Sequence, residues 1–321
     1  MSSATASATG LLTSTSPARR NHPAGRFWER VADPLYAAFV VILLGTAVIA
    51  IIYPLYFVVI ASISDPNQIY EGNVWLWPKG ITFEGYARMF STSTIIRGFA
   101  NSLLYTVVGA TILVCSILGA GYALSRRTLP FRRTIMAAFI VTMFFAGGMI
   151  ARYLVVRELG MLNTMWAVVL PGAIGVTNLV IARTFFSTTI PEELHEAAEL
   201  DGSSELRYFF QIVLPLSKAL IMLLVVTHAV AYWNQFFDAM IYLNDETKYP
   251  LQLVLRTILI QSDASGSGLS ATGMDSYAES QRIAELMKYG MIVVSTFPLL
   301  AALPFAHKYF AQGAMIGAVK S

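Results

Sequence analysis

Six long stretches without a charged residue constrain this chain more than any other feature of its sequence. They are residues 35–64, 98–125, 134–151, 159–182, 219–237 and 289–306. Each is close to the ~20 residues with which an α-helix crosses the ~30 Å hydrocarbon core of a bilayer. Backbone polar groups in lipid must be satisfied within their own segment, so each stretch is predicted to be helical. The sequence therefore predicts an all-α integral membrane protein with six transmembrane helices.

Composition agrees with this interpretation and excludes other classes. Of the 321 residues, 56% are hydrophobic and 13% are charged, against about 25% charged residues in soluble domains. The net charge of +3 is too small and too dispersed to predict a nucleic-acid partner. A single cysteine, Cys115, excludes an internal disulfide, and the four histidines show no spacing typical of metal ligands.

Details within the stretches predict their geometry. The first two are longer than a span requires, so they are expected to tilt or to extend past the bilayer. Pro54 and Pro171 predict kinks. Gly119 and Ala123 form a small pair at i,i+4, which predicts close contact between helices.

Basic residues predict the orientation in a bacterial plasma membrane. Arginines precede the first stretch and crowd the connection between the second and the third, at Arg19, Arg20, Arg26, Arg30, Arg126, Arg127, Arg132 and Arg133. The positive-inside rule assigns this side to the cytoplasm, and both termini with it. We expect a disordered cytoplasmic tail over 1–30, a six-helix domain over 31–321 and a cytoplasmic C-terminal tail over 307–321. An outer loop is expected over 239–288, with a flexible Ser/Gly-rich insert at 262–273.

Residues 189–217, here called the acidic segment, interrupt the apolar pattern. Six carboxylates lie between Glu192 and Glu205. Thr189 and Glu192 have capping-box spacing with Pro191 in the first turn, and Gly202 is typical of a helix stop. Ser203 or Ser204 can cap a second short helix that ends at Leu214–Pro215.

This segment carries a family resemblance. Its spacing is Glu-Ala-Ala, three residues, Gly, nine residues, Ile, one residue and Leu-Pro, at Glu196, Ala197, Ala198, Gly202, Ile212, Leu214 and Pro215. It resembles the EAA motif of permease subunits of binding-protein-dependent ABC importers. The resemblance implies the type I ABC importer permease fold, with these residues in a cytoplasmic coupling loop that docks on an ATPase subunit. The implied partners are a second homologous permease, two ATPase subunits and an extracytoplasmic solute-binding protein. The alternative is a solvated acidic loop between two spans.

The wider resemblance is to carbohydrate importers. Gly147-Gly148, Leu159-Gly-Met-Leu-Asn-Thr164, Trp233-Asn234 and Tyr249-Pro-Leu-Gln-Leu253 are similar to the permeases of that group, and most of all to the subgroup for oligo- and polysaccharides. One departure is Ala219, where many relatives have proline, and this puts the bend entering the fifth span in doubt.

The chain shows no catalytic motif. It contains no Gly-x-x-x-x-Gly-Lys-Ser/Thr phosphate loop, no Gly-x-Ser-x-Gly and no His-Glu-x-x-His. We therefore expect no cofactor and no enzyme activity, with ATP and Mg²⁺ bound by partner subunits. Three alternatives stay open: an integral-membrane enzyme, a secondary transporter, and the same architecture importing a non-sugar solute.

The fifth stretch is the candidate wall of the pathway. On a helical wheel, polar side chains fall within one arc, at His228, Tyr232, Asn234, Gln235 and Asp238. Polar groups at this depth are costly against lipid, so the arc is expected to face a substrate-accessible aqueous cavity. The alternative is hydrogen bonding between helices or subunits. Arg152 and Arg157 are interpreted as interface anchors rather than substrate ligands.

Overall fold

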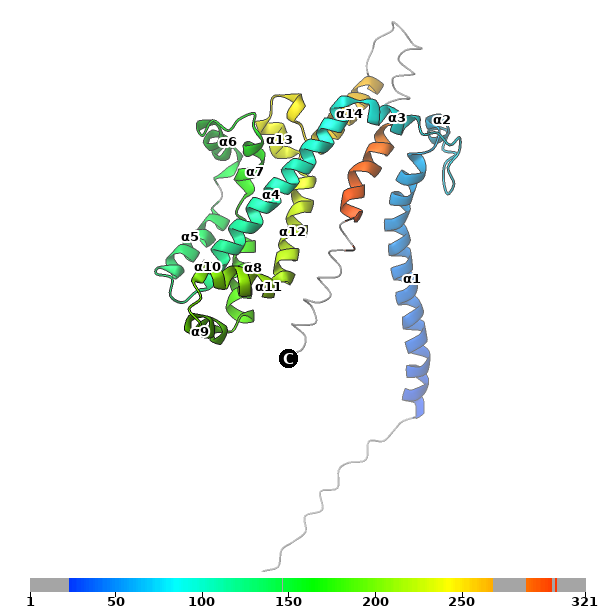
Figure 1. Cartoon of the computed structure of the whole chain (residues 1–321). Coiled ribbons are helices and arrows are strands. Elements are labelled where there is room, and N and C mark those ends of the chain that lie inside the picture. The colour runs from blue at the N-terminus through cyan, green and yellow to red at the C-terminus, as the bar shows by residue number, and fades with distance from the viewer. Residues whose placement is uncertain (1–22, 146, 268–286, 302–303, 305–321) are drawn as a thin grey trace, which may run out of the picture. The chain divides into compact units, whose positions relative to one another are not determined.

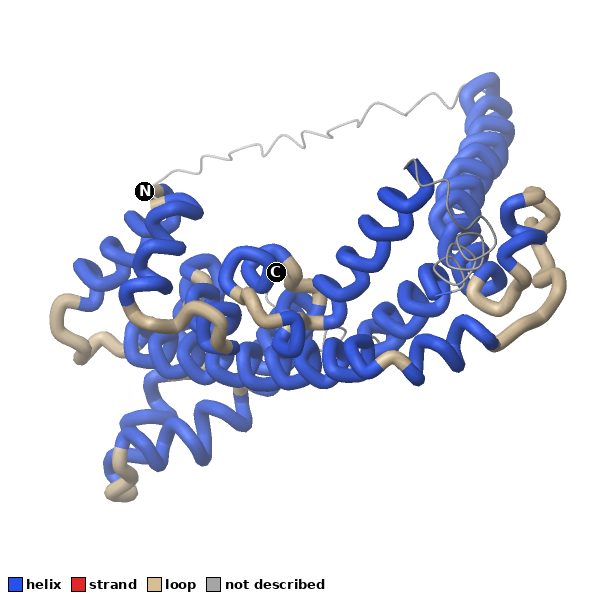
Figure 2. The backbone as a smooth tube through the Cα atoms, turned by 90° about the horizontal axis from the view of Figure 1, so that it is seen from above, coloured by secondary structure: helices blue, strands red, loops and turns tan. Residues whose placement is uncertain are grey.

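The computed structural model describes residues 23–145, 147–267, 287–301 and 304. All regular secondary structure in these ranges is helical, and they contain no strand (Figure 2). The predicted all-α class is confirmed for this part of the chain. The expectations for residues 1–22, for 268–273 of the Ser/Gly-rich insert and for the tail 307–321 lie outside the described residues.

Two compact units, Met1–Tyr56 and Phe57–Ser321, divide the chain within α1 (Pro23–Ala61). Over residues 36–61 this helix is long and apolar enough to cross a membrane. It begins before the predicted boundary at 35 and continues through Pro54. The proline therefore lies within the helix and does not end it.

The second unit is built around α4 (Ser93–Ser125), which packs against α8 (Val176–Thr189), α12 (Lys218–Trp233) and α14 (Leu251–Ser267) (Figure 1). At 33 residues, α4 exceeds the length of one span, as expected. The remaining elements of this unit are α2 (Pro66–Tyr70), α3 (Glu84–Ser91), α5 (Arg132–Phe144), α6 (Gly148–Glu158), α7 (Met165–Val169), η1 (Leu170–Gly172), α9 (Glu192–Leu200), α10 (Glu205–Tyr208), the π-turn η2 (Phe209–Val213), α11 (Leu214–Leu216), α13 (Phe237–Tyr242), η3 (Glu246–Lys248) and the last helix Met287–Ala301.

Glycines on α4 allow close helix contact, although the predicted position was wrong. A Cβ at Gly109 would lie 2.7 Å from the ring of Tyr232 on α12, and one at Gly121 would lie 2.9 Å from Cβ of Ala182 on α8. A Cβ at Gly119 would meet nothing within 4 Å. Gly119 and Gly121 are two residues apart and therefore face different sides of the helix.

Three of the predicted spans are bent or broken helices in the structure. The helices α5 and α6 meet at 116°, so the prediction of one continuous helix over 134–151 was wrong. The stretch from α7 through η1 bends by 50° against α8, next to Pro171, where a kink was predicted. The fifth predicted span ends at Trp233, before the expected boundary at 237.

The number of spans depends on how the bent pairs are counted. Two described helices are long and apolar enough by themselves, and up to five spans result if each bent pair crosses once. The apolar helix Met287–Ala301 lies within the sixth predicted stretch. Six spans therefore stay a prediction.

The predicted outer loop over 239–288 is largely helical where it is described. It contains most of α13, η3 and α14, and α14 packs along α4. Asn101 of α4 donates hydrogen bonds to the carbonyls of Thr247 and Tyr249, and Ser102 accepts one from the Leu251 amide. Helix packing and hydrogen bonds between α4 side chains and this backbone thus hold the region against α4.

Candidate functional site

The acidic segment forms two short helices joined by a turn at Gly202. Helix α9 ends in a pair of backbone bonds, Gly202 N to Glu199 O at 2.9 Å and Ser203 N to Ala198 O at 2.9 Å. This is the Schellman arrangement, in which the residue after the helix takes a left-handed conformation. Gly202 has φ +72°, so the predicted stop is confirmed. The predicted capping box was wrong, because Thr189 is the last residue of α8 and Pro191 is the N-cap without a side-chain bond.

The second helix begins as expected and ends later than expected. Ser204 caps α10 by accepting a hydrogen bond from the Arg207 amide. The helix then passes through the π-turn η2 and continues to Leu216, beyond the predicted end at Leu214–Pro215. A bend of 78° separates it from α12, so the turn into the fifth span forms without a proline at Ala219. Ser217 lies at this bend, fully buried, with its hydroxyl bonded to the Val213 carbonyl.

One face of the acidic segment is part of the hydrophobic core of the second unit, Phe57–Ser321. Ala198 and Val213 are buried in one cluster with Ile117 of α4, Phe186 of α8 and Leu224 of α12. Ile212 and Leu214 pack against the same cluster. The inward face of the segment is therefore in direct packing contact with these three helices, and close-packed interiors transmit strain.

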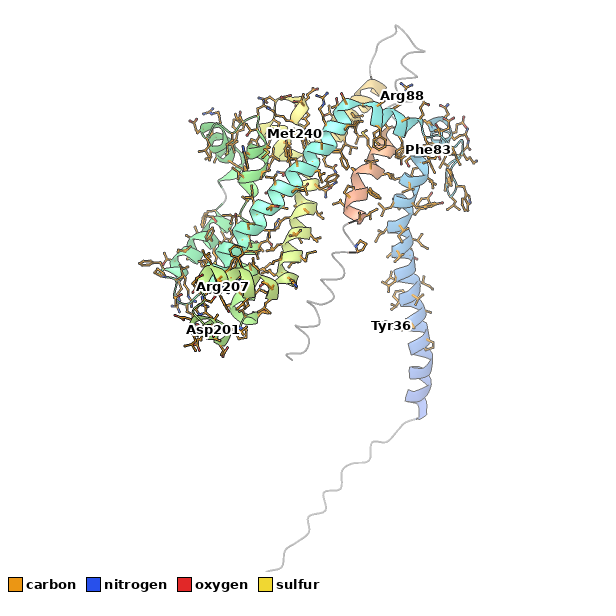
Figure 3. The ribbon with its side chains drawn as sticks, viewed as in Figure 1. Tyr36, Phe83, Arg88, Asp201, Arg207 and Met240 are labelled. Carbon is orange, nitrogen blue, oxygen red and sulfur yellow. The ribbon has the colours of Figure 1, made fainter. Side chains whose placement is uncertain are left out.

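Polar contacts tie the segment to the end of α4. The Glu205 carboxylate accepts a hydrogen bond from the Tyr122 hydroxyl at 2.9 Å, lies 2.9 Å from His195 Nε2, and faces Arg126 at 3.6 Å. Arg127 pairs with Glu192 at 3.5 Å. Figure 3 shows Asp201 and Arg207 at this same end of the unit. The segment is therefore held to α4 by charge as well as by apolar packing.

These contacts predict a pH dependence of stability. Burial raises the pKa of Glu205, but hydrogen bonds from Tyr122 and His195 and the charge of Arg126 together lower it by more, so the pKa lies below the ordinary glutamate value. A lowered carboxyl pKa contributes stability above the unfolded-state pKa, and this contribution is lost as pH falls through the folded-state value. Between about pH 6 and about pH 3, we expect Glu205→Gln to reduce the acid-induced fall in Tm by about 1–3 °C, measured by thermal unfolding in nanodiscs.

The matched control for this prediction is Glu196→Gln. Glu196 is exposed and has no hydrogen bond or ion pair within the described ranges, so its substitution should leave the pH dependence of Tm unchanged. An unchanged pH dependence in Glu205→Gln would contradict the assignment.

The other face of the acidic segment is exposed. Glu196 and Ala197 are exposed on α9, and Leu200 and Leu206 on either side of the turn are 90% and 71% exposed. Exposed apolar side chains beside unpaired carboxylates are typical of a protein contact surface. The motif residues thus have three different positions in the segment. The core side holds Ala198, Ile212 and Leu214, the turn is at Gly202, and the exposed side holds Glu196 and Ala197.

The predicted polar arc of the fifth span does not lie on one helix. Helix α12 ends at Trp233, Asn234 is its C-cap and Asp238 belongs to the first turn of α13. Asn234 is exposed and its amide bonds back to the Val230 carbonyl. Gln235 donates to the Asp238 carboxylate at 2.6 Å across the break. The helical wheel over 228–238 was therefore wrong beyond Trp233.

His228 and Tyr232 lie beside a small cavity. Its volume is about 200 Å³, and its lining includes His228, Tyr232 and Gln235. His228 Nε2 is 2.9 Å from the amide nitrogen of Asn178 on α8, a partner that sequence reasoning missed. Tyr232 is only 7% exposed, and its hydroxyl donates to the Val169 carbonyl at 2.9 Å. The sequence leaves two roles open for this residue, a pathway wall and a hydrogen bond between helices. The structure shows the hydrogen bond between helices at Tyr232.

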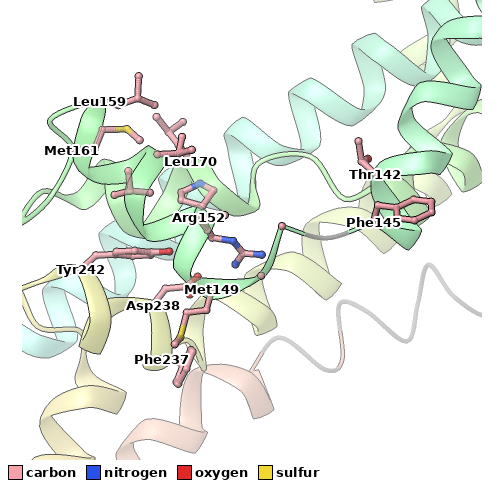
Figure 4. A pocket seen from close by; sticks show the side chains of 16 residues that line it. Thr142, Phe145, Met149, Arg152, Leu159, Met161, Leu170, Phe237, Asp238 and Tyr242 are labelled. Carbon is pink, nitrogen blue, oxygen red and sulfur yellow. The ribbon is translucent and has the colours of Figure 1, made fainter.

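Asp238 lies on a larger cavity of about 790 Å³ (Figure 4). Its walls come from α5, α6, η1 and α13, and the break between α5 and α6 opens it. Arg152 of α6 extends into this cavity, with Asp238 and Tyr242 on the wall. From the sequence, Arg152 was predicted to lie at the membrane interface, because it follows directly after an apolar stretch. The hydropathy pattern does not reveal the bend between α5 and α6, and this bend brings Arg152 to the cavity. This size lies in the range of small-molecule sites.

Apolar bent helices, an internal cavity with a few polar groups and an exposed two-helix segment define the transmembrane subunit of a solute transporter. The chain is 38% identical over 280 residues to the protein LplC of Bacillus subtilis strain 168, covering 87% of this chain and 93% of LplC. It is 38% identical over 292 residues to the polygalacturonan/rhamnogalacturonan transport system permease protein YtcP of the same strain, covering 91% and 99%. The chain belongs to the family of sugar ABC transporter permeases. Its function is that of a permease subunit, as the resemblance implied.

More distant comparisons agree. The melibiose/raffinose/stachyose import permease protein MelC of Bacillus subtilis is 25% identical over 284 residues, covering 87% of this chain and 96% of MelC. A solved bacterial ABC transporter involved in the import of the acidic polysaccharide alginate has a chain with TM-score 0.79 and 28% identity, covering 87% of this chain and 98% of that one. No model of a protein family matches the chain.

Proposed function

We propose that this permease conducts an acidic oligosaccharide and that the cavity around Arg152 is part of the pathway. The main supporting observation is that a cation, Arg152, lines the wall of a cavity of about 790 Å³ with mostly apolar surroundings. Arg152 forms no salt bridge with any of the described residues, and the carboxylate of an anionic substrate would supply one. YtcP and the alginate transporter, whose names specify acidic polysaccharides, support this substrate class.

Each polar group in the cavity has a role in this proposal. The Arg152 guanidinium binds a uronate carboxylate through paired N–H donors. The Asp238 carboxylate on the wall is placed to accept hydrogen bonds from sugar hydroxyls, and the buried Tyr242 completes the wall. Phe237 and Met149 supply apolar surface for the sugar rings. His228, Tyr232, Asn234 and Gln235 form the neighbouring part of the pathway wall or hold its helices together.

The acidic segment couples this pathway to ATP hydrolysis on another chain. We propose that the chain works with a second homologous permease, two ATPase subunits and an extracytoplasmic sugar-binding protein. In this arrangement six spans lie in a bacterial plasma membrane, with both termini and the acidic segment in the cytoplasm. ATP and Mg²⁺ are bound by the ATPase subunits, and this chain binds no cofactor. The inward face of the segment supports the coupling, because it packs directly on α4, α8 and α12.

The test of the substrate class is Arg152→Gln. We expect uptake of an acidic oligosaccharide, such as a galacturonate trimer, to fall about ten-fold or more, since a charged hydrogen bond is worth about 1.5–3 kcal/mol. Arg152→Lys should retain part of the uptake. The measurement is radiolabelled uptake into cells or proteoliposomes that carry the complete transporter.

Arg157→Gln is the matched control. Arg157 is five residues away on the same helix, pairs with Glu158 at 2.8 Å and does not line the cavity. Its substitution should leave uptake of the acidic sugar unchanged. If Arg152→Gln transports the acidic sugar at the parent rate, the substrate class is wrong.

A further inference from the structure

A polar pocket lies between the acidic segment and the neighbouring ends of α4, α5 and α8, and it shares no lining residue with the cavity around Arg152. Its volume is about 460 Å³, and it is enclosed by the end of α4, the start of α5, the end of α8 and residues of the acidic segment. Four arginines line it, at Arg126, Arg127, Arg132 and Arg183. Two glutamates, Glu192 and Glu193, also line it, and Glu205 pairs with Arg126 at 3.6 Å, so four arginines face three carboxylates and the net charge is positive by one.

The arginines are only partly satisfied by protein groups. Arg127 pairs with Glu192 at 3.5 Å, Arg132 donates to the Arg126 carbonyl at 3.5 Å, and Arg183 donates to the Leu124 carbonyl at 3.4 Å. Each contact is long, and each uses one nitrogen of a guanidinium that has five N–H donors. All four arginines line the same pocket and keep further N–H donors for a ligand.

Two buried polar atoms on this pocket have no protein partner. The Tyr208 hydroxyl and the Arg126 Nε are both buried without a hydrogen bond. Tyr208 is only 2% exposed and lines the pocket. Leaving a buried donor unsatisfied costs about 1–3 kcal/mol, so a ligand that accepts hydrogen bonds would remove this cost.

We propose that this pocket binds a phosphate group. A phosphate offers several acceptor oxygens and up to two negative charges, and these match paired arginine donors and a tyrosine hydroxyl. The pocket begins where the apolar part of α4 ends, so the phosphate could belong to an anionic lipid headgroup or to a free phosphate ion. A bound phosphate would bridge α4, α5 and α8 to the acidic segment. The proposal does not depend on the identity of the transported solute.

The test uses a reporter inside the pocket of the full chain in lipid nanodiscs. Ser187 lines the pocket and is exposed, so Ser187→Cys in a Cys115→Ala background can carry an environment-sensitive fluorophore. One arm titrates inorganic phosphate into phosphatidylcholine nanodiscs at constant ionic strength, with chloride as the reference anion. The other arm replaces phosphatidylcholine stepwise by phosphatidylglycerol. A saturable response is expected in one of the two arms, and that arm identifies the source of the phosphate.

Matched substitutions show whether the response comes from this pocket. Arg132→Gln should weaken the apparent affinity about ten-fold, and Tyr208→Phe should weaken it about three-fold or more without removing any hydrogen bond within the protein. Arg133→Gln removes the same charge one residue away, outside the pocket lining, and should leave the affinity unchanged. No saturable response in either arm, or equal effects of Arg132→Gln and Arg133→Gln, would overturn the proposal.

Discussion

Uptake is expected to fall to background when Glu196 is replaced by lysine, while the protein still reaches the membrane. Glu196 is exposed on the outer face of α9 and has no ion pair within the described part of the chain. Its substitution therefore removes no contact inside this permease. In the proposed complex the reversed charge opposes a basic groove of the ATPase, and like charges at an interface cost several kcal/mol. The measurements are uptake, membrane abundance and co-purification of the ATPase subunit.

The controls separate docking from folding. Glu158→Lys makes the same charge change at the end of α6, and it should transport normally. The Glu158 carboxylate is 72% exposed, and among the described residues its one ion-pair partner is Arg157. Gly202→Val should also lose uptake, because a β-branched residue at φ +72° is strained by about 1–2 kcal/mol. A Cβ at Gly202 would meet nothing within 4 Å, so the strain is conformational and Gly202→Asn should be tolerated. Normal uptake by Glu196→Lys at equal abundance would refute the docking role.

Gly109→Val is expected to remove most of the folded protein. A Cβ at this position would lie 2.7 Å from the Tyr232 ring. That ring cannot move aside easily, since it is buried and its hydroxyl is bonded to the Val169 carbonyl. Overpacking of this kind costs about 1–3 kcal/mol or more, which is a large part of a typical net stability. The measurement is the yield of monodisperse protein and its apparent Tm.

Gly119→Val is the matched control on the same helix. It introduces the same side chain where nothing lies within 4 Å, so yield and Tm should stay close to those of the parent. Tyr232→Ala in the Gly109→Val background should recover part of the yield by making room. If Gly109→Val and Gly119→Val behave alike, α4 and α12 do not pack as the structure shows.

The acidic segment was the most predictable part of the molecule. Gly202 ends α9 by taking a left-handed backbone conformation, and Ser204 caps α10 by accepting a hydrogen bond from an amide three residues later. Such local rules need no knowledge of the rest of the fold. The capping box at Thr189 failed because α8 continues through this residue and Pro191 is the N-cap of α9 instead.

Arg152 and Tyr232 show where sequence reasoning ends. Arg152 was placed at the interface because hydropathy assumes a straight span, and the 116° break after α5 redirects α6. Tyr232 was placed on a polar face, but the absence of a side chain at Gly109 lets α12 approach α4 and bury the ring. The partner of His228 is Asn178, which lies fifty residues earlier in the chain.

The sequence by itself determined the membrane class, the helical content, the transporter family and the turn at Gly202. The membrane class and the helical content follow from composition and from the need to satisfy backbone groups in lipid, and the turn follows from short-range spacing. The family follows from the resemblance of the acidic segment to the EAA motif. Only the tertiary structure decided which residues share a cavity, how the spans break, and which face of the acidic segment is buried. Those properties depend on contacts between residues such as Arg126 and Glu205, far apart in sequence, whose cost or benefit exists only after the helices have packed.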